Sequence, residues 1–180
     1  IAPIELPGEI ELSRAIPTAV ALAPQHLRGA VELICVAIAE NTVTGDVAAF
    51  AKDDTVKQSI KGLMADHLLD EGRHSGFWSR MVRIYWHTAS EEDRQCIARI
   101  LPVFIGHYLT NDIQKSFDFR LIDALRISDT ARHALKREVS GLAFPINRHH
   151  PLVTNIVRFF HSSSLLDSPC VQRALSDYLI

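Results

Sequence analysis

One helical pattern, from about Thr55 to Thr88, constrains the fold more than any other part of the sequence. Its apolar side chains recur every three or four residues, which is the period of an α-helix and not of a strand. On a helical wheel they fall within about 60° of His67; they are Ile60, Leu63, Met64, Trp78, Met81, Val82 and Tyr85. We expect this apolar arc to be buried against the rest of the protein.

Three polar side chains lie inside that arc: His67, Glu71 and His74. Glu71 lies about 40° to one side of His67 and His74 about 20° to the other. A carboxylate buried beside two imidazoles costs roughly several kcal/mol unless it is paired or coordinates a metal ion. Taken singly, each could be an ordinary core residue, with Glu71 paired to an arginine. The three together on one arc favour a metal site.

A second helix is predicted from about His26 to Ala51, and it is apolar nearly all round, as a central helix would be. Glu40 interrupts its apolar pattern on the face that also carries Leu33 and Val36. Glu40 could pair with a buried arginine or face a water, and Glu32 is a competing carboxylate. The neighbouring His-Glu-His trio favours Glu40 as a further ligand.

The rest of the chain also reads as helices, and no segment shows a convincing strand alternation. We expect an extended lead-in with a short helical turn near Glu11 to Ala15, and Asp53-Asp54 as a helix cap. The further predictions are a helix after the cap Ser90 with a kink or restart at Pro102, helices at 111–125 and 128–139, a loop at 149–151, an apolar helix at 152–160 and a short helix from Pro169 to Leu179. The fold class is therefore all-α.

Composition narrows the function classes. A length of 180 residues fits one domain, and a net charge of −2 without a long run of one sign indicates neither a nucleic acid nor an anionic membrane as partner. No apolar stretch reaches about 18 residues. The three cysteines form no Cys-x-x-Cys pair, so neither a zinc ribbon nor a disulfide framework is indicated, and a reducing, cytoplasmic setting fits.

Glu40 on one helix, with Glu71-x-x-His74 on the next, is half of the ligand set of a carboxylate-bridged dinuclear iron or manganese site. Carboxylates bridge hard cations and balance their charge, while imidazoles add nitrogen donors. The sequence lacks the His-Glu-x-x-His of zinc proteases, the Gly-x-Ser-x-Gly of serine hydrolases and a phosphate-binding glycine loop.

Glu40 followed by His67-x-x-x-Glu71-x-x-His74, within the segment 66–74, resembles the second half of the metal motif of the p-aminobenzoate N-oxygenase (AurF-like) family. The similarity extends roughly from Val31 to Leu109. It implies a ferritin-like helical bundle with two iron ions. It also implies that O2 oxidises an amine nitrogen to a hydroxylamine or nitro group in specialised biosynthesis, with an external electron donor.

The resemblance also implies roles for the residues. Glu40 would be the bridging or terminal carboxylate of the third core helix, Glu71 and His74 the Glu-x-x-His pair of the fourth, and His67 the additional imidazole that distinguishes this family. Asp70 is placed to accept a hydrogen bond from a ligand imidazole, although simple solvation would explain it equally.

The family's first half supplies another Glu and another Glu-x-x-His, and this sequence contains Glu-x-x-His once, at Glu71. Because Ile1 is not a natural start, we expect residues 1–180 to be a single helical domain from the C-terminal portion of a longer diiron oxygenase chain. About a hundred upstream residues, enough for two bundle helices, would supply the missing ligands. The alternative is that two copies pair as a homodimer to complete the site.

Candidate substrate contacts are His107 and Tyr108, on a helix expected to pack against the site, and Arg148 within the segment 147–150, which could hold an anionic substrate end. The competing interpretations are that Tyr108 is a core residue, that His107 is an exposed or satisfied polar residue, and that 147–150 is a solvated loop.

Three functional hypotheses follow from these patterns. The first is an N-oxygenase acting on a small amine, with an electron-donor protein or other reductant as partner. The second is another ferritin-like diiron oxidase or a metal store, which would not need His67. The third is a non-catalytic helical interaction module.

Overall fold

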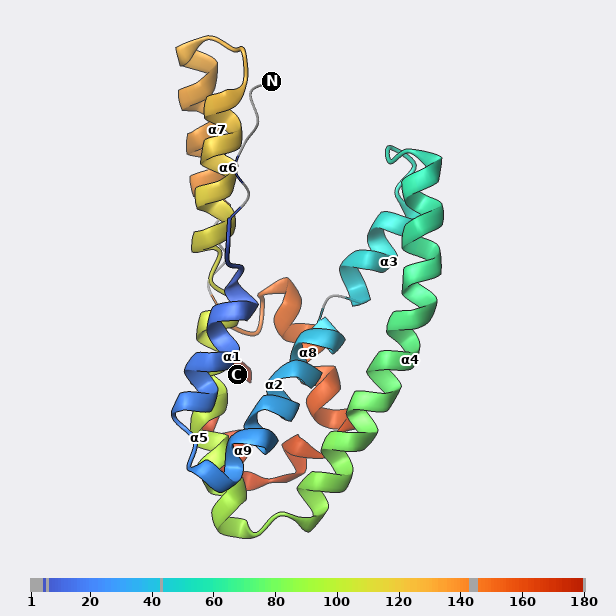
Figure 1. Cartoon of the computed structure of the whole chain (residues 1–180), viewed down its shortest axis with the longest axis vertical. Coiled ribbons are helices and arrows are strands. Elements are labelled where there is room, and N and C mark those ends of the chain that lie inside the picture. Colours follow the sequence, from blue (N-terminus) through green and yellow to red (C-terminus); the bar gives the residue numbers. More distant parts are fainter. Residues whose placement is uncertain (1–4, 6, 43, 143–145, 180) are drawn as a thin grey trace.

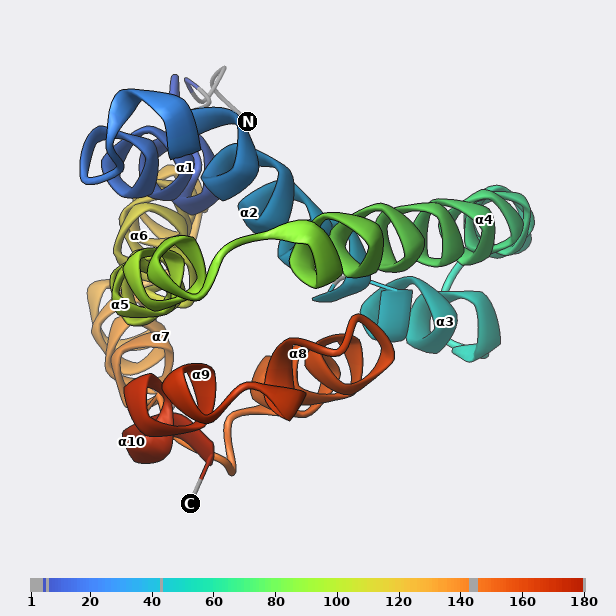
Figure 2. The same cartoon turned by 90° about the horizontal axis from the view of Figure 1, so that it is seen from below.

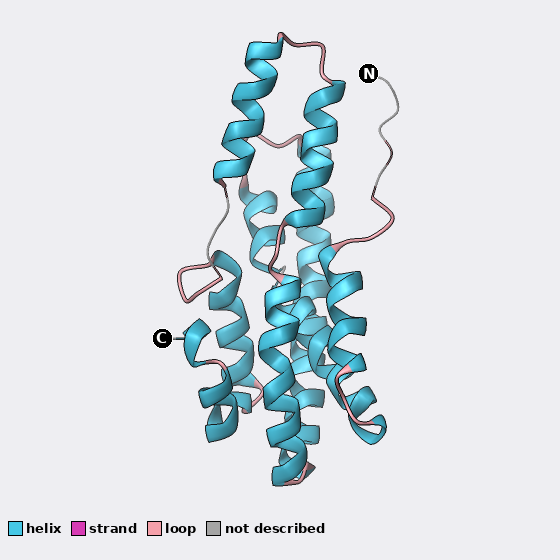
Figure 3. Ribbon diagram, turned by 90° about the vertical axis from the view of Figure 1, so that its left-hand side faces the viewer, coloured by secondary structure: helices cyan, strands magenta, loops and turns pink. Residues whose placement is uncertain are grey.

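The computed structural model describes residue 5 and residues 7–42, 44–142 and 146–179 (Figure 1). Within these ranges the chain is helical apart from turns and short connections, and it contains no strand (Figure 3). The sequence-based prediction of an all-α fold is therefore confirmed. None of the helices in these ranges combines the length and the apolar character that crossing a bilayer requires.

The body of the molecule is built around α2, whose inner residues are almost completely buried. Figure 2 shows α1 and α2 along one edge of the body and α8 and α9 along the opposite edge. The helices concerned are α1 (Glu11–Ala21), α2 (Arg28–Thr42), α5 (Glu91–Tyr108), α8 (Pro151–Ser162), α9 (Pro169–Ala174) and α10 (Ser176–Leu179), with short 3-10 turns at Gln25–Leu27 and Leu165–Asp167. Ile34, Phe104 and Phe160 are fully buried in this core, and their burial supplies much of the apolar driving force for folding.

Two arms extend from the body in the same direction (Figure 1). In one, α3 (Thr44–Lys52) packs along the first half of α4 (Gln58–Thr88). In the other, α6 (Asp112–Ala124) packs against α7 (Asp129–Gly141). The second half of α4 belongs to the body, where Val82 and Trp86 are buried. Glu71 lies near the middle of α4 and is buried.

Several local predictions hold. Ser90 caps α5 by accepting a hydrogen bond from the backbone N–H of Asp93, and Ser128 caps α7 in the same way through Ala131. α7 runs slightly beyond the predicted 139 and ends at Gly141. α5 continues through Pro102 without a restart.

The N-terminal segment is more helical than predicted, because contacts far along the chain stabilise it. α1 runs for 11 residues instead of one turn, with Pro17 inside it. The Glu11 carboxylate accepts hydrogen bonds from the backbone N–H groups of Ile113 and Gln114 at 3.1 and 3.0 Å, and Arg14 pairs with Asp112 at 2.6 Å. Local sequence carries no signal for such long-range contacts.

Three other boundaries differ from the predictions. The single helix predicted at 26–51 is two helices, α2 and α3. Asp53 does not cap α4, which begins after Lys57; instead its carboxylate accepts hydrogen bonds from the backbone N–H and the hydroxyl of Thr55, closing a turn. The predicted loop at 149–151 ends at His150, because Pro151 is the first residue of α8.

His150 caps α8 as a neutral imidazole, and this predicts a pH dependence. Its Nδ1 accepts a hydrogen bond from the Leu152 N–H at 3.2 Å, and burial lowers the pKa of His150 below its ordinary 6.5. The unfolded chain therefore takes up a proton that the folded chain resists, and stability falls as the pH drops below about 6.5.

The wild type should lose more unfolding free energy between about pH 7.5 and pH 5 than His150→Asn, which keeps a capping side chain without a titrating one. Urea unfolding at both pH values measures the difference. Equal losses in the two proteins would contradict the capping role of the neutral imidazole.

Candidate metal centre

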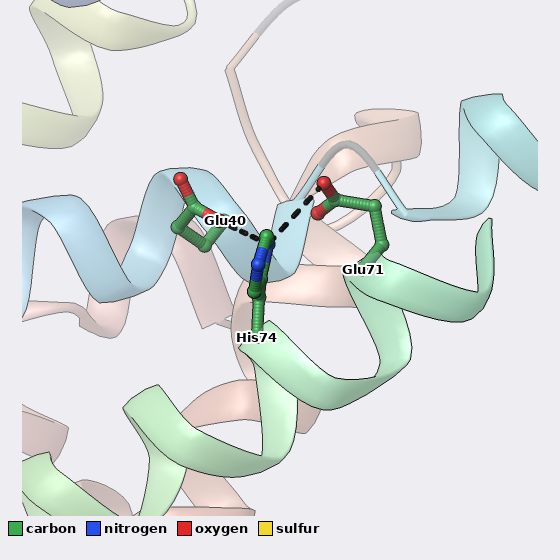
Figure 4. A group of neighbouring side chains, drawn as sticks. All are labelled: Glu40, Glu71 and His74. Atoms are coloured by element: carbon green, nitrogen blue, oxygen red, sulfur yellow. Dashed lines mark ion pairs between the residues drawn. The ribbon is translucent and has the colours of Figure 1, made fainter. Parts of the chain in front are cut away.

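Two helices bring the predicted carboxylate and imidazole ligands together. α2 and α4 lie side by side, and Figure 4 shows Glu40 from α2 facing Glu71 and His74 from α4. One ligand atom from each of these three residues lies within 4.8 Å of the others. His74 Nδ1 is 3.5 Å from Glu40 Oε2 and 3.6 Å from Glu71 Oε1. This spacing suits two carboxylates and an imidazole that share a cation.

The Glu71 carboxylate gives the strongest sign that a cation belongs here. Glu71 is only 5% exposed, and its buried Oε2 has no hydrogen-bond partner among the described residues. Its other oxygen, Oε1, is 3.4 Å from His67 Nε2. A buried, unsatisfied acceptor costs about 1–3 kcal/mol, and more if it is charged. A metal ion bound by that oxygen would remove the cost, so the residues present fit a divalent cation with oxygen and nitrogen ligands.

The two imidazoles are more exposed than the apolar arc predicted. The side chains of His67 and His74 are 48% and 53% exposed, and that of Glu40 is 35% exposed. Of the four predicted ligands, Glu40, Glu71 and His74 converge, whereas His67 joins the group through its contact with Glu71. The predicted burial is correct for Glu71 and wrong for both histidines.

The imidazoles belong to an open face of α4, which we define by the exposed residues Leu63, Phe77, Met81 and Ile84. On the wheel these residues lie about 80–140° from Glu71, on the same side as His67 and His74. Ile60 is exposed as well, so the predicted burial of Ile60, Leu63 and Met81 is wrong. No described helix covers the open face. The buried side of α4 instead faces α2 and α8.

The other predicted site residues lie outside this cluster. Asp70 is exposed and pairs with Arg73 at 3.2 Å. Tyr108 is partly buried and stacks on Phe104, while exposed Arg148 donates to His149 at 3.2 Å. Their proposed roles, like the ligand assignments, stay predictions.

His107 lines a different cavity, of about 460 Å³, between α1, α5 and the start of α6, together with Arg14 and Asp112. Since Glu40, Glu71 and His74 belong to α2 and α4, this cavity is separate from the metal cluster. The predicted role of His107 in substrate binding gains no support from this position.

Sequence reasoning missed a cavity of about 400 Å³, lined by both polar and apolar side chains, next to two residues of the cluster. Asn41 and Ser75, which directly follow Glu40 and His74 in the chain, line it together with α8. The full lining is Asn41, Ala48, Ser75, Asn155, Arg158, Phe159 and Ser162. A signal was present for Ser75, which the wheel places on the buried side of α4, about 40° from Glu71.

Comparison with known proteins identifies the family. A family model described as P-aminobenzoate N-oxygenase AurF matches residues 1–144. No curated protein and no solved structure matches the chain. The chain therefore belongs to the p-aminobenzoate N-oxygenase family, whose members are diiron enzymes with a ferritin-like helical fold. The predicted family and the predicted ferritin-like fold class are both confirmed.

Substituting Glu71 should separate metal binding from folding. We expect Glu71→Gln to keep the apoprotein within about 1 kcal/mol of wild-type stability, or to raise it, because the amide needs no counter-ion. With Co²⁺ at about 100 times its Kd, the wild type should gain about 2.7 kcal/mol and the variant nothing. Chemical unfolding with and without Co²⁺ measures both quantities.

Asp66→Asn is the matched control, because it changes an exposed carboxylate on the same helix that has no assigned role, and it should keep the full Co²⁺ effect. An equal gain from Co²⁺ in wild type and Glu71→Gln would rule out Glu71 as a ligand.

Proposed function

We propose that this member of the p-aminobenzoate N-oxygenase family is a non-haem diiron oxygenase that oxidises the nitrogen of a small amine. The observation that carries the proposal is the convergence of Glu40 and His74 on the buried, unsatisfied carboxylate of Glu71. Family membership supplies the reaction class.

In this proposal the residues of the cluster hold the metal ions. Glu40 and Glu71 would provide oxygen ligands that offset the cationic charge, and His74 a nitrogen ligand. His67, 3.4 Å from Glu71 Oε1, would add the second imidazole. A ferritin-like store has no need of this fourth group, so its position favours the oxygenase over a plain metal store.

When bound, two irons supply activation of O2. One oxygen atom enters the amine N–H bond to give a hydroxylamine, and the other leaves as water with two protons and two electrons. These electrons would come from an external donor. Further rounds of the same reaction would lead towards the nitro group.

The ligands assigned here make up half of a diiron set, since the sequence contains one Glu-x-x-His. The open face of α4, with His67 and His74 half exposed among Leu63 and Phe77, is where the other half would pack. We propose that helices outside residues 1–180 cover this face and supply another Glu and another Glu-x-x-His. Burial of the apolar side chains would drive that packing.

Metal stoichiometry tests this arrangement. Residues 1–180 alone should bind at most about one Co²⁺ per chain and keep the same mass with and without metal. Equilibrium dialysis and light scattering measure the two values. A metal-dependent dimer holding two ions would instead show that a second copy completes the site.

Oxygenation is tested with the natural polypeptide that carries the complete ligand set. It is loaded with Fe²⁺ without oxygen, then given a reductant, p-aminobenzoate or related aryl amines, and ¹⁸O₂. Mass spectrometry should detect a hydroxylamine or nitro product that contains ¹⁸O. Iron that is oxidised and retained without any amine product would contradict the proposal and favour a metal store.

His67→Ala should lower the rate of amine oxidation by about 10-fold or more while the iron content falls by less than about twofold. The matched control is His87→Ala, an exposed histidine on the same helix, which should change neither quantity. If rate and iron content fell in parallel, the separate role of His67 would be lost.

A further inference from the structure

Three polar contacts join α2, α4 and α8 in pairs around the cavity beside the cluster. Ser75 on α4 donates to Asn41 Oδ1 on α2 at 2.5 Å. Asn155 on α8 donates to the Thr42 carbonyl of α2 at 3.0 Å. The hydroxyls of Ser162 on α8 and Ser79 on α4 are 3.2 Å apart. Each pair of helices is thus joined by at least one polar side-chain contact beside this cavity.

The Ser75 hydroxyl is unusual for a serine within a helix. Such hydroxyls commonly donate to a carbonyl three or four residues earlier in their own helix, as Thr42 does to Ile38 and Thr88 to Tyr85. Ser75 instead donates across to another helix. A hydroxyl used in this way constrains the two helices relative to each other.

The Asn41 side chain is held ready to accept that hydrogen bond. Its Nδ2 donates to the Ala37 carbonyl at 2.7 Å, within α2. This contact orients the amide so that Oδ1 faces α4, where Ser75 meets it. Both side chains are partly buried, so water competes less for the bond than it would at the surface.

The Asn41–Ser75 bond lies one residue along the chain from two of the metal ligands. Glu71 and His74 share α4, so their spacing is set by the helix itself. Glu40 comes from α2, and its 3.5 Å approach to His74 depends on how α2 and α4 are placed. Among the described contacts, the Ser75–Asn41 hydrogen bond joins these two helices directly beside the ligands.

We propose that Asn41 and Ser75 are positioning residues for the metal centre. Their hydrogen bond sets the register of α2 against α4 and so brings the Glu40 carboxylate to the ligands of α4. This inference rests on the proposed function, because it requires that Glu40, Glu71 and His74 bind metal.

The test compares metal affinity with apoprotein stability in the full chain. Co²⁺ titrations, followed by visible absorbance and by competition with a chelator, give the Kd and a spectrum that reports the ligand geometry. Ser75→Ala should weaken Co²⁺ binding on the order of 10-fold and shift the absorption bands. Ser75→Thr keeps the hydroxyl and should bind Co²⁺ with wild-type affinity.

Ser162→Ala is the matched control, since it removes the contact between α4 and α8 and leaves the two ligand helices joined. The apoproteins of Ser75→Ala and Ser162→Ala should melt at similar temperatures, whereas only Ser75→Ala should lose affinity. Asn41→Ala removes the same hydrogen bond from the other side and should weaken Co²⁺ binding by a similar amount. The double variant with Ser75→Ala should bind Co²⁺ no more weakly than either single variant, because both remove the same bond.

Equal affinities of Ser75→Ala and Ser162→Ala, or additive losses in the double variant, would overturn the positioning role. If Ser75→Ala fails to fold, the affinity of Asn41→Ala decides the question in the same way. Wild-type protein that binds no Co²⁺ would instead refute the proposed metal centre itself, so the two failures are distinguishable.

Discussion

The buried carboxylate of Glu71 is the constraint around which the candidate site is organised. It lies near the middle of α4, which extends from the body into the α3–α4 arm (Figure 1), so a helix with buried apolar residues also carries a buried polar group. One oxygen is near His67 and His74, and the other has no hydrogen-bond partner within the described residues. Such a group destabilises a purely structural core. It is well suited to a protein whose stable form contains a cation.

The rest of the fold places a second carboxylate against the first. α2 is central because it is apolar nearly all round, and its last turns run beside α4 (Figure 2). Glu40 is therefore carried on a helix with buried residues along most of its length, while Glu71 and His74 belong to a helix that exposes one face. A largely buried helix and a partly open one then form the two sides of the centre.

Sequence periodicity predicted the features that depend on local residues. The caps Ser90 and Ser128 and the burial of Glu71 follow from spacing along the chain. The convergence of Glu40 with Glu71 joins two helices and was expected from the pattern of metal ligands instead. Sequence periodicity could not show which side of a long amphipathic helix packs against another helix. Leu63 and Met81 were expected to be buried because they are apolar, but no described helix reaches their side of α4.

Other features required the three-dimensional structure because they join distant parts of the chain. Glu11 meets the start of α6, which stabilises a helix that its own sequence barely predicts. Ser75 meets Asn41 across 34 positions. A serine on the buried face of a helix indicates that a hydrogen-bond partner exists, but it does not identify that partner.

Family membership and the geometry of this cluster lead to the same chemistry. The p-aminobenzoate N-oxygenases are diiron enzymes, and carboxylates paired with Glu-x-x-His are the ligands such centres use. In our proposal the exposed apolar face beside His67 and His74 is where the remaining ligands of the centre would pack.

Anomalous diffraction from crystals of the chain grown with Co²⁺ is the most direct test of this account. We predict a peak at the cobalt absorption edge between Glu40, Glu71 and His74, with Glu71 Oε2 at about 2.0–2.2 Å from the metal. A peak only at surface histidines, with the Glu71 carboxylate still unsatisfied or turned towards solvent, would contradict it.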